Sequence, residues 1–214
     1  MRVLRFLLLA VVALAATAAQ ADDVGALTHF YQQVESLSAH FSQEEKAEDG
    51  AVLRQSSGVF LLSRPGKFRW AYKKPYQQII VSNGQVLKFY DVGLAQVTIQ
   101  PVAQTLQATP AQLLTGGVGL QEAFKVQSQG EQDGLTWLQL TPRSQQSDFK
   151  SIQLGVHDGI PAVMVLADKL GQTTHIEFSD IKVNPSLDAD DFDIDVPDDV
   201  TVVDTRKQGA EDRR

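Results

Sequence analysis

The chain contains no cysteine. A thiol is needed for a disulfide bond, for a thiolate metal site and for lipid attachment behind a lipoprotein signal, so the sequence excludes all three. Long apolar runs are also scarce, because the clearest one, Phe6 to Ala16, is too short to span a membrane. We therefore expect a freely soluble protein that carries neither covalent cross-links nor a lipid anchor of its own.

The first 21 residues have the order of a cleavable secretory signal. Arg2 and Arg5 precede the apolar run, and the small-residue sequence Ala19-Gln20-Ala21 follows it. Cleavage after Ala21 would remove both arginines and change the formal net charge from −7 to −9. We expect residues 22–204 to form one domain, residues 205–214 to be a disordered tail, and the periplasm to be the location.

Basic residues are in the minority, 19 against 26 acidic ones. Bulk binding to nucleic acid needs a net positive field that releases phosphate counterions. The charge balance therefore argues against nucleic acid as a partner, and any basic contact has to be local.

Familiar catalytic and metal-binding motifs are missing as well. The sequence has no Gly-x-Ser-x-Gly elbow, no His-Glu-x-x-His helix and no phosphate-binding loop, and its four histidines share no ligand spacing. We predict that the protein is not an enzyme and needs no cofactor and no metal.

The acidic segment DADDFDIDVPDD raises the possibility of a calcium site. An EF-hand loop would need an oxygen ligand in place of Phe192 and a glycine in place of Asp193. Phe192, Ile194 and Val196 instead alternate with aspartates, and this period of two predicts a strand with one buried face.

Apart from one helix, the period of the chain is that of short strands. Residues 22–37 have apolar side chains three or four positions apart, which predicts an amphipathic helix. From Ser38 the period changes to two, and about ten strand-like runs follow. Turn pairs separate several of them, including Asp133-Gly134 and Asp158-Gly159, and Asn83-Gly84 predicts a type I′ hairpin. The pattern predicts an antiparallel sheet that is curled into a barrel or half-barrel.

The stretch RPGKFRWAYKKPYQQ concentrates cations and aromatic rings. Counting by twos places Phe68, Trp70 and Tyr72 on one strand face, while Lys67, Arg69 and Lys73 fall on the other. A single-stranded nucleic-acid platform would need both kinds of side chain on one face. The next hairpin segregates its side chains in the same way, with Ile80, Leu87 and Phe89 on one face. This apolar face is either a packed core or a pocket, and periodicity does not separate the two.

One segment interrupts the strands. Thr109 and Pro110 suit a helix N-terminus, and Gly116-Gly117 would end the helix after barely two turns. Leu113 and Leu114 are too apolar for a solvated loop. We therefore expect a short helix that covers the mouth of the barrel.

Taken together, these motifs resemble the LolA family of periplasmic lipoprotein carriers over nearly the whole chain after the signal. The matching segments are SSGVFLLSRPGKFRW, the VSNG turn, YDVGLAQV, TPAQLL, LTWLQLTP, MVLADKLGQTTHIEFSDIKVNP and FDIDVPDDV. The receptor lipoprotein of the same pathway shares the fold but would need a lipidated cysteine, which this chain lacks.

The resemblance implies an unclosed antiparallel β-barrel with a helical lid over a hydrophobic cavity for lipoprotein acyl chains. It implies that Arg64 is a latch that hydrogen-bonds the lid, and that Phe68 meets the lid near Leu113 and Leu114. The cavity wall would then include Trp70, Tyr72, Ile80, Leu87 and Phe89.

As partners, the resemblance implies an ATP-driven inner-membrane complex that supplies the cargo and an outer-membrane receptor that takes it, with the carrier acting as a monomer. A binding protein for a free lipid or another apolar small molecule would use the same cavity, and a purely structural β-domain would fill it. These two alternatives stay open at the level of the residues.

Overall fold

A computed structural model describes residues 25, 27–102, 110–115 and 120–206. Four sequence predictions fall wholly or partly outside these residues: the signal at 1–21, the cap at Thr109, the glycine pair Gly116-Gly117 and most of the tail, 207–214.

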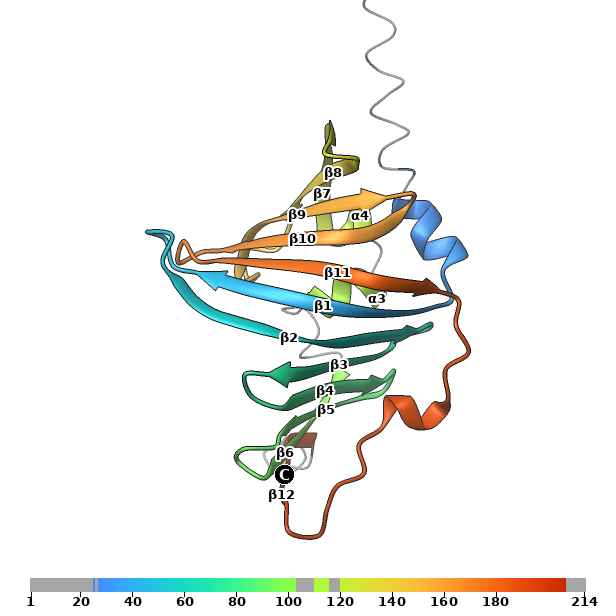
Figure 1. The fold of residues 1–214 in the computed structure, drawn as a ribbon, viewed down its shortest axis with the longest axis vertical. Coiled ribbons are helices and arrows are strands. Elements are labelled where there is room, and N and C mark those ends of the chain that lie inside the picture. Colours follow the sequence, from blue (N-terminus) through green and yellow to red (C-terminus); the bar gives the residue numbers. More distant parts are fainter. Residues whose placement is uncertain (1–24, 26, 103–109, 116–119, 207–214) are drawn as a thin grey trace, which may run out of the picture.

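Twelve strands in the described part of the chain form one sheet (Figure 1). They are β1 (Ser36–Lys46), β2 (Val52–Ser63), β3 (Lys67–Lys74), β4 (Gln78–Asn83), β5 (Val86–Asp91), β6 (Gln96–Pro101), β7 (Phe124–Gln132), β8 (Leu135–Pro142), β9 (Phe149–His157), β10 (Ile160–Asp168), β11 (Thr173–Val183) and β12 (Thr201–Asp204). Their spatial order is β12-β6-β5-β4-β3-β2-β1-β11-β10-β9-β8-β7. Neighbouring strands are antiparallel except β12, which pairs parallel to β6. Because β12 and β7 stand at opposite edges, the sheet curls without closing, and the predicted unclosed barrel is confirmed.

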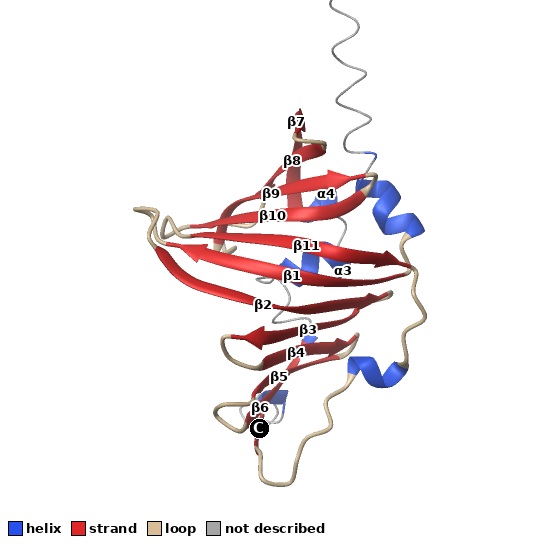
Figure 2. Cartoon of the chain, in the orientation of Figure 1, coloured by secondary structure: helices blue, strands red, loops and turns tan. Residues whose placement is uncertain are grey.

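Two short helices, α3 (Pro110–Thr115) and α4 (Leu120–Ala123), lie in the connection between β6 and β7. β6 is next to one edge of the sheet and β7 is the other edge. The connection therefore has to cross from one side of the sheet to the other, and α3 contacts β2 and β3 on the way. Figure 2 shows these helices behind the strands. The predicted helix from Pro110 is confirmed.

The N-terminal helix ends before the end of the predicted span, 22–37. Among the described residues, 25 and 27–33 are helical, and β1 begins at Ser36. Asn184 explains the end of the helix, since its Nδ2 donates to Gln33 O and its Oδ1 accepts from the amides of Glu35 and Ser36. A side chain from the far end of the chain thus satisfies backbone groups that a longer helix would have used itself.

The hairpin turns follow the predicted positions with one correction. Asp133 and Gly134 both have positive φ, 55° and 75°, and so do Asp158 and Gly159, 47° and 78°, as two-residue hairpin loops prefer. Gly84 has φ of 93°, but Asn83 remains in β4 and is not among the residues with positive φ, so the type I′ prediction there is wrong. Asn83 Oδ1 instead accepts from the amides of Gln85 and Val86, which closes the turn through the side chain.

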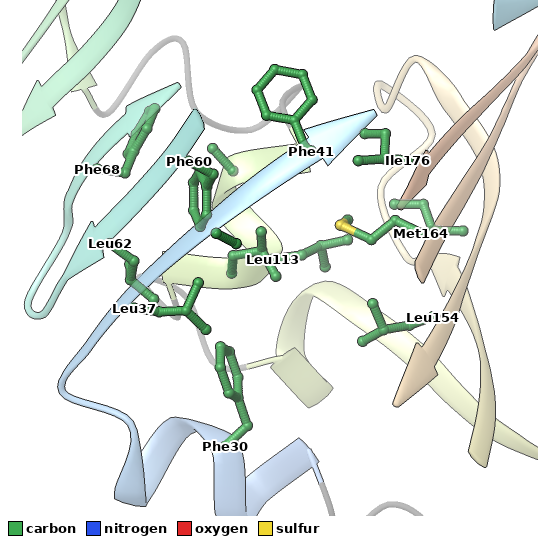
Figure 3. Packing of buried hydrophobic residues seen from close by; sticks show 14 of the residues in the cluster. Phe30, Leu37, Phe41, Phe60, Leu62, Phe68, Leu113, Leu154, Met164 and Ile176 are labelled. Carbon is green, nitrogen blue, oxygen red and sulfur yellow. The ribbon is translucent and has the colours of Figure 1, made fainter. Parts of the chain in front are cut away.

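The concave face of the sheet carries the main core. Along β1, Ala39, Phe41 and Gln43 are buried while His40 and Ser42 are exposed, so the predicted alternation is confirmed. Both halves of the sheet and α3 contribute to one cluster of buried apolar side chains. Figure 3 shows Leu113 in the middle of this cluster, with Phe60 and Leu62 to one side and Met164 and Leu154 to the other.

A second, smaller cluster lies on the outer face. Residues 185–200, which we call the C-terminal strap, connect β11 to β12 and include the short 3-10 helix η2 (Ala189–Phe192). Phe192 and Ile194 are buried against Val81 of β4. The predicted strand over residues 192–196 is wrong, because Phe192 belongs to η2 and residues 193–196 form no strand. Burial still alternates along this segment, since an extended chain can lay every second side chain on a sheet without pairing with it.

Candidate functional site

Arg64 joins three parts of the molecule at one end of the concave face. It follows β2 directly, at the turn that leads into β3. Its Nε donates to Val34 O over 2.7 Å, its Nη1 to Thr115 O over 2.6 Å and its Nη2 to Leu114 O over 3.0 Å. The fork of the guanidinium thus binds the C-terminal carbonyls of α3 and the end of the N-terminal helix together.

Tyr31 completes this arrangement from the N-terminal helix. Its hydroxyl donates to Leu113 O, so three successive carbonyls of α3 accept hydrogen bonds from two side chains. The guanidinium carbon of Arg64 also lies 5.0 Å from the ring centre of Phe30 and 5.1 Å from that of Tyr31. The last carbonyls of a helix lack partners inside the helix and carry partial negative charge, so a cation and a hydroxyl suit them.

Burial shapes the protonation of both groups. It raises the pKa of Tyr31 to about 12, against the opposing influence of the Arg64 charge. Burial also lowers the pKa of Arg64, but arginine stays protonated at any physiological pH. Tyr31 is therefore a neutral donor and Arg64 a cationic donor whenever α3 is in this position.

The buried face of α3 lies on the concave side of the sheet. Ala111, Leu113 and Leu114 are all at most 4 % exposed and belong to the main core cluster. Phe68, at 1 % exposed, is in the same cluster and lies on β3, which α3 contacts. Arg64, Phe68, Leu113 and Leu114 thus lie in one region of the concave face, and the roles that the family resemblance implies for them stay predictions.

The predicted wall residues continue the same apolar face. Trp70 and Leu87 are buried in the main cluster, and Tyr72 and Ile80 pack against it. The remaining residue, Phe89, is partly buried and pairs with Ile80 across β4 and β5. Periodicity did not separate a packed core from a pocket, and in this structure α3 packs on this face.

Aromatic rings concentrate on this wall. Trp70 lies 5.2 Å from Phe41 and 4.9 Å from Phe60, and it stacks on Tyr72 at 6.5 Å, measured between ring centres. Gly58 makes room for them, because a Cβ on this residue would meet Ala71 O at 1.9 Å and the Phe41 ring at 2.9 Å.

The cations of the same stretch point the other way. Arg69 reaches the outer face, where its Nη1 donates to Asp193 O over 2.9 Å and to Asp191 O over 3.3 Å in the C-terminal strap. Lys88 pairs with Asp193 beside it. The predicted segregation of aromatic and basic side chains is confirmed, and part of the basic face attaches the strap to the sheet.

Sequence reasoning missed Tyr31 as a polar residue of this site. Tyr31 is one of the regularly spaced apolar positions of the predicted helix over 22–37, and its ring packs against the main core cluster. A hydroxyl on an otherwise apolar face needs a buried partner, and that was the available signal. The partner, Leu113, is 82 residues away in the sequence.

Two searches of the described residues bear on other functions. They contain no group of three or more His, Asp or Glu side chains placed to hold a metal ion. Within the same residues, no helix combines the length and apolar character needed to cross a membrane.

Comparison with protein families gives a match over most of the chain. The model of the family described as outer membrane lipoprotein carrier protein LolA matches residues 32–195. Arg64, Tyr72 and the α3 residues all lie inside this range.

Individual relatives agree with the family match. An outer-membrane lipoprotein carrier protein of Methylibium petroleiphilum is 41% identical over 189 residues, which is 88% of this chain and 93% of that protein. One of Nitrosomonas europaea is 39% identical over 201 residues, 94% of this chain and 98% of that protein. Among solved structures, an uncharacterized conserved protein from Thermus thermophilus has a TM-score of 0.58 at 15% identity. The match covers 86% of this chain and 99% of that one, and the two chains share the fold.

Proposed function

The chain belongs to the family of outer membrane lipoprotein carrier protein LolA, and on that premise we propose that it carries lipoproteins across the periplasm. It takes a lipoprotein released from the inner membrane by an ATP-driven complex and passes it to a receptor on the outer membrane. It acts as a monomer and as a chaperone, and its family is one of carriers and not of enzymes.

The observation that carries this proposal is the apolar concave face under α3. A lipidated protein cannot cross water alone, because each exposed methylene costs about 0.8 kcal/mol, or about 10 kcal/mol for a chain of roughly a dozen. A carrier has to hide this surface, and an apolar sheet face under a movable cover does so. Leu113 and Leu114 now occupy space on this face that acyl chains would take.

We propose that α3 is the lid and that Arg64 is its latch. When the lid is closed, Leu113 and Leu114 compete with cargo for the same wall. The apparent affinity for cargo is then the intrinsic affinity multiplied by the fraction of empty carrier that is open. This reduction lets the carrier release cargo to a receptor that binds more tightly, so the hydrogen bonds of Arg64 favour delivery over retention.

The proposal is tested by purifying the protein from the periplasm of cells that produce it and identifying bound material by mass spectrometry. Acylated proteins in stoichiometric amounts are expected. Free lipid without acylated protein would instead identify a lipid-binding protein, and an empty chain that also fails to bind an environment-sensitive apolar dye would indicate a structural domain with a filled core.

A further inference from the structure

Among the described residues, two buried side-chain atoms have no hydrogen-bond partner: Ser56 Oγ and Trp70 Nε1. Both side chains are deeply buried, at 9 % and 3 % exposed. An unsatisfied buried donor destabilises the folded state, so each such group in a folded protein calls for an explanation. The other tryptophan, Trp137, has no such deficit, because its Nε1 donates to Gln132 O over 3.3 Å.

The two atoms belong to one part of the concave face, with Tyr72 between them. The Tyr72 ring stacks on Trp70, and its hydroxyl donates to Gln43 Oε1 over 3.1 Å. Gln43 lies directly opposite Ser56 in the pairing of β1 with β2. Gln43 bonds Tyr72 through its oxygen and Glu45 Oε1 through its nitrogen, over 2.8 Å, and makes no hydrogen bond to Ser56.

A pocket of about 380 Å³ opens beside Ser56. Its lining mixes polar groups, including Arg54, Lys74 and Tyr72, with two side chains that are largely exposed, Tyr76 and Leu94. Ser56 lies eight residues before Arg64 along β2, roughly 26 Å at the rise of a strand. The pocket is therefore at the end of the sheet that is remote from the latch.

Both unpartnered atoms can donate a hydrogen bond, and an indole N–H can only donate. The missing partner is therefore an acceptor that enters an apolar, aromatic surrounding. Carbonyl oxygens of acyl esters meet this description, since they accept hydrogen bonds and are attached to hydrocarbon chains. Water alone would not suit the site of Trp70, which is surrounded by Phe41, Phe60 and Phe178.

We infer that Ser56 and Trp70 form a polar subsite that binds the ester carbonyls joining the acyl chains of the cargo to its acylated N-terminus. This inference rests on the proposed carrier function and adds an orientation to it. The carbonyls lie at the Ser56 end, the peptide part leaves through the pocket beside Arg54 and Lys74, and the acyl chains extend along the wall toward Phe68 and the lid. The empty carrier leaves both donors unsatisfied, and cargo supplies their acceptors.

The test compares two probes on the delipidated full chain: a synthetic diacyl-glyceryl-cysteine lipopeptide and its dialkyl ether analogue, which lacks the ester carbonyls. The ester is expected to bind about tenfold or more tightly than the ether. Ser56→Ala should weaken ester binding about fivefold and leave ether binding unchanged. Ser57→Ala, at the neighbouring position on the opposite strand face, is the matched control and should alter neither. Because Ser56→Ala removes an unsatisfied hydroxyl, the empty variant should be at least as stable as the original protein.

A second measurement needs no substitution. The chain has two tryptophans, so a ¹H–¹⁵N spectrum contains two indole cross-peaks. The ester probe should shift the Trp70 indole proton downfield, whereas the ether should not produce that shift, and the Trp137 peak serves as the internal reference. Equal affinity for the two probes without an ester-specific shift of Trp70 would overturn the subsite and leave the carrier function intact. If neither probe binds, the proposed function fails and the subsite with it.

Discussion

Arg64 donates three hydrogen bonds to backbone carbonyls where α3 meets the N-terminal helix. A single guanidinium binds carbonyls of α3 and of the end of the N-terminal helix, while its flat face lies over Phe30 and Tyr31. Lysine could keep the charge but not the planar fork, because an ammonium group lacks that fixed arrangement of donors. The geometry of the group, and not its charge alone, is therefore what suits it to hold α3.

We predict that Arg64→Leu slows the transfer of bound lipoprotein from the carrier to acceptor outer membranes by about tenfold. Leucine fills part of the space but leaves the carbonyls of Val34, Leu114 and Thr115 without this donor. The empty carrier should therefore stay open, and the lid should compete less with cargo for the concave face. The measurement is the half-time of transfer from preloaded carrier. The transfer half-time of Arg64→Lys should lie between those of the original protein and Arg64→Leu. Transfer at the normal rate by Arg64→Leu would show that Arg64 is no latch.

Tyr31→Phe should have a smaller effect in the same direction. The change removes only the hydroxyl that bonds Leu113 O and keeps the ring under Arg64. Loss of one neutral hydrogen bond is worth about 1 kcal/mol, so transfer should slow by about fivefold. Tyr90→Phe is the control, since this side chain packs against the smaller cluster on the outer face, away from α3. Equal transfer half-times for the two variants would exclude Tyr31 from the latch.

At the scale of elements, the position of α3 follows from the topology of the sheet. β6 and β7 lie toward opposite edges, so their connection must pass over one face. The concave face is apolar, and Ala111, Leu113 and Leu114 give the crossing segment an apolar side of its own. The same burial that keeps α3 in place would make it a competitor of cargo under the proposed lid role.

Leu114→Ala should therefore open the lid without unfolding the sheet. Truncation of a buried leucine costs about 2 kcal/mol at the lower end of its range, which would shift the closed–open balance by about thirtyfold. An environment-sensitive apolar dye should bind the empty variant more tightly than the original protein. Leu170→Ala, at a side chain that is 76 % exposed, should bind the dye as before. Unchanged dye binding by Leu114→Ala would mean that α3 does not gate the concave face.

The C-terminal strap is a separate element with its own core. Phe192→Ala should reduce the free energy of unfolding by about 3 kcal/mol, as expected for a buried phenylalanine that is truncated. Hydrogen exchange should increase first in residues 185–204, because Phe192 packs on the outer face near Val81 and not on the lid. An increase that began instead in α3 would show that the two faces are coupled.

For the whole molecule, two buried tyrosines predict how stability depends on alkaline pH. Burial raises the pKa of both Tyr31 and Tyr72 from 10.0 to about 12. A pKa that is higher in the folded state means that the folded chain binds the proton more tightly, so this stability is fully present below pH 10 and is lost as the pH rises toward 12. The midpoint of urea unfolding should therefore fall over this range, and the double change Tyr31→Phe, Tyr72→Phe should flatten the fall. An equally steep fall in the double variant would show that the loss of stability at alkaline pH comes from groups other than these two tyrosines.

Much of this fold could be predicted from local patterns. The period of two identified β1, the inward face of β3 and the hairpin of β4 and β5, because it is a property of any extended chain with one buried side. The same rule misled at residues 192–196, where burial alternates along a segment that does not pair as a strand. Alternation reports which side chains are buried, and it does not report hydrogen bonding between strands.

The site was predicted less completely than the fold. Arg64, Phe68, Leu113 and Leu114 meet as expected, but that expectation came from the family resemblance and not from spacing. Tyr31 remained hidden because its acceptor is a backbone carbonyl, and every residue carries one of those. The end of the N-terminal helix was missed for a similar reason, since it depends on Asn184, about 150 residues away.

By itself, the sequence determined that the chain forms an antiparallel sheet with one apolar face, with no disulfide and with a short helix between two sets of strands. These features depend on neighbours within a few positions, where the direction of each side chain follows from the backbone. Only the tertiary structure decided that three carbonyls of α3 meet Tyr31 and Arg64, and that Ser56 and Trp70 are buried without partners. The hydrogen bonds to α3 join residues from 50 to 82 positions apart, and no local period contains that information, because the curvature of the sheet brings them together.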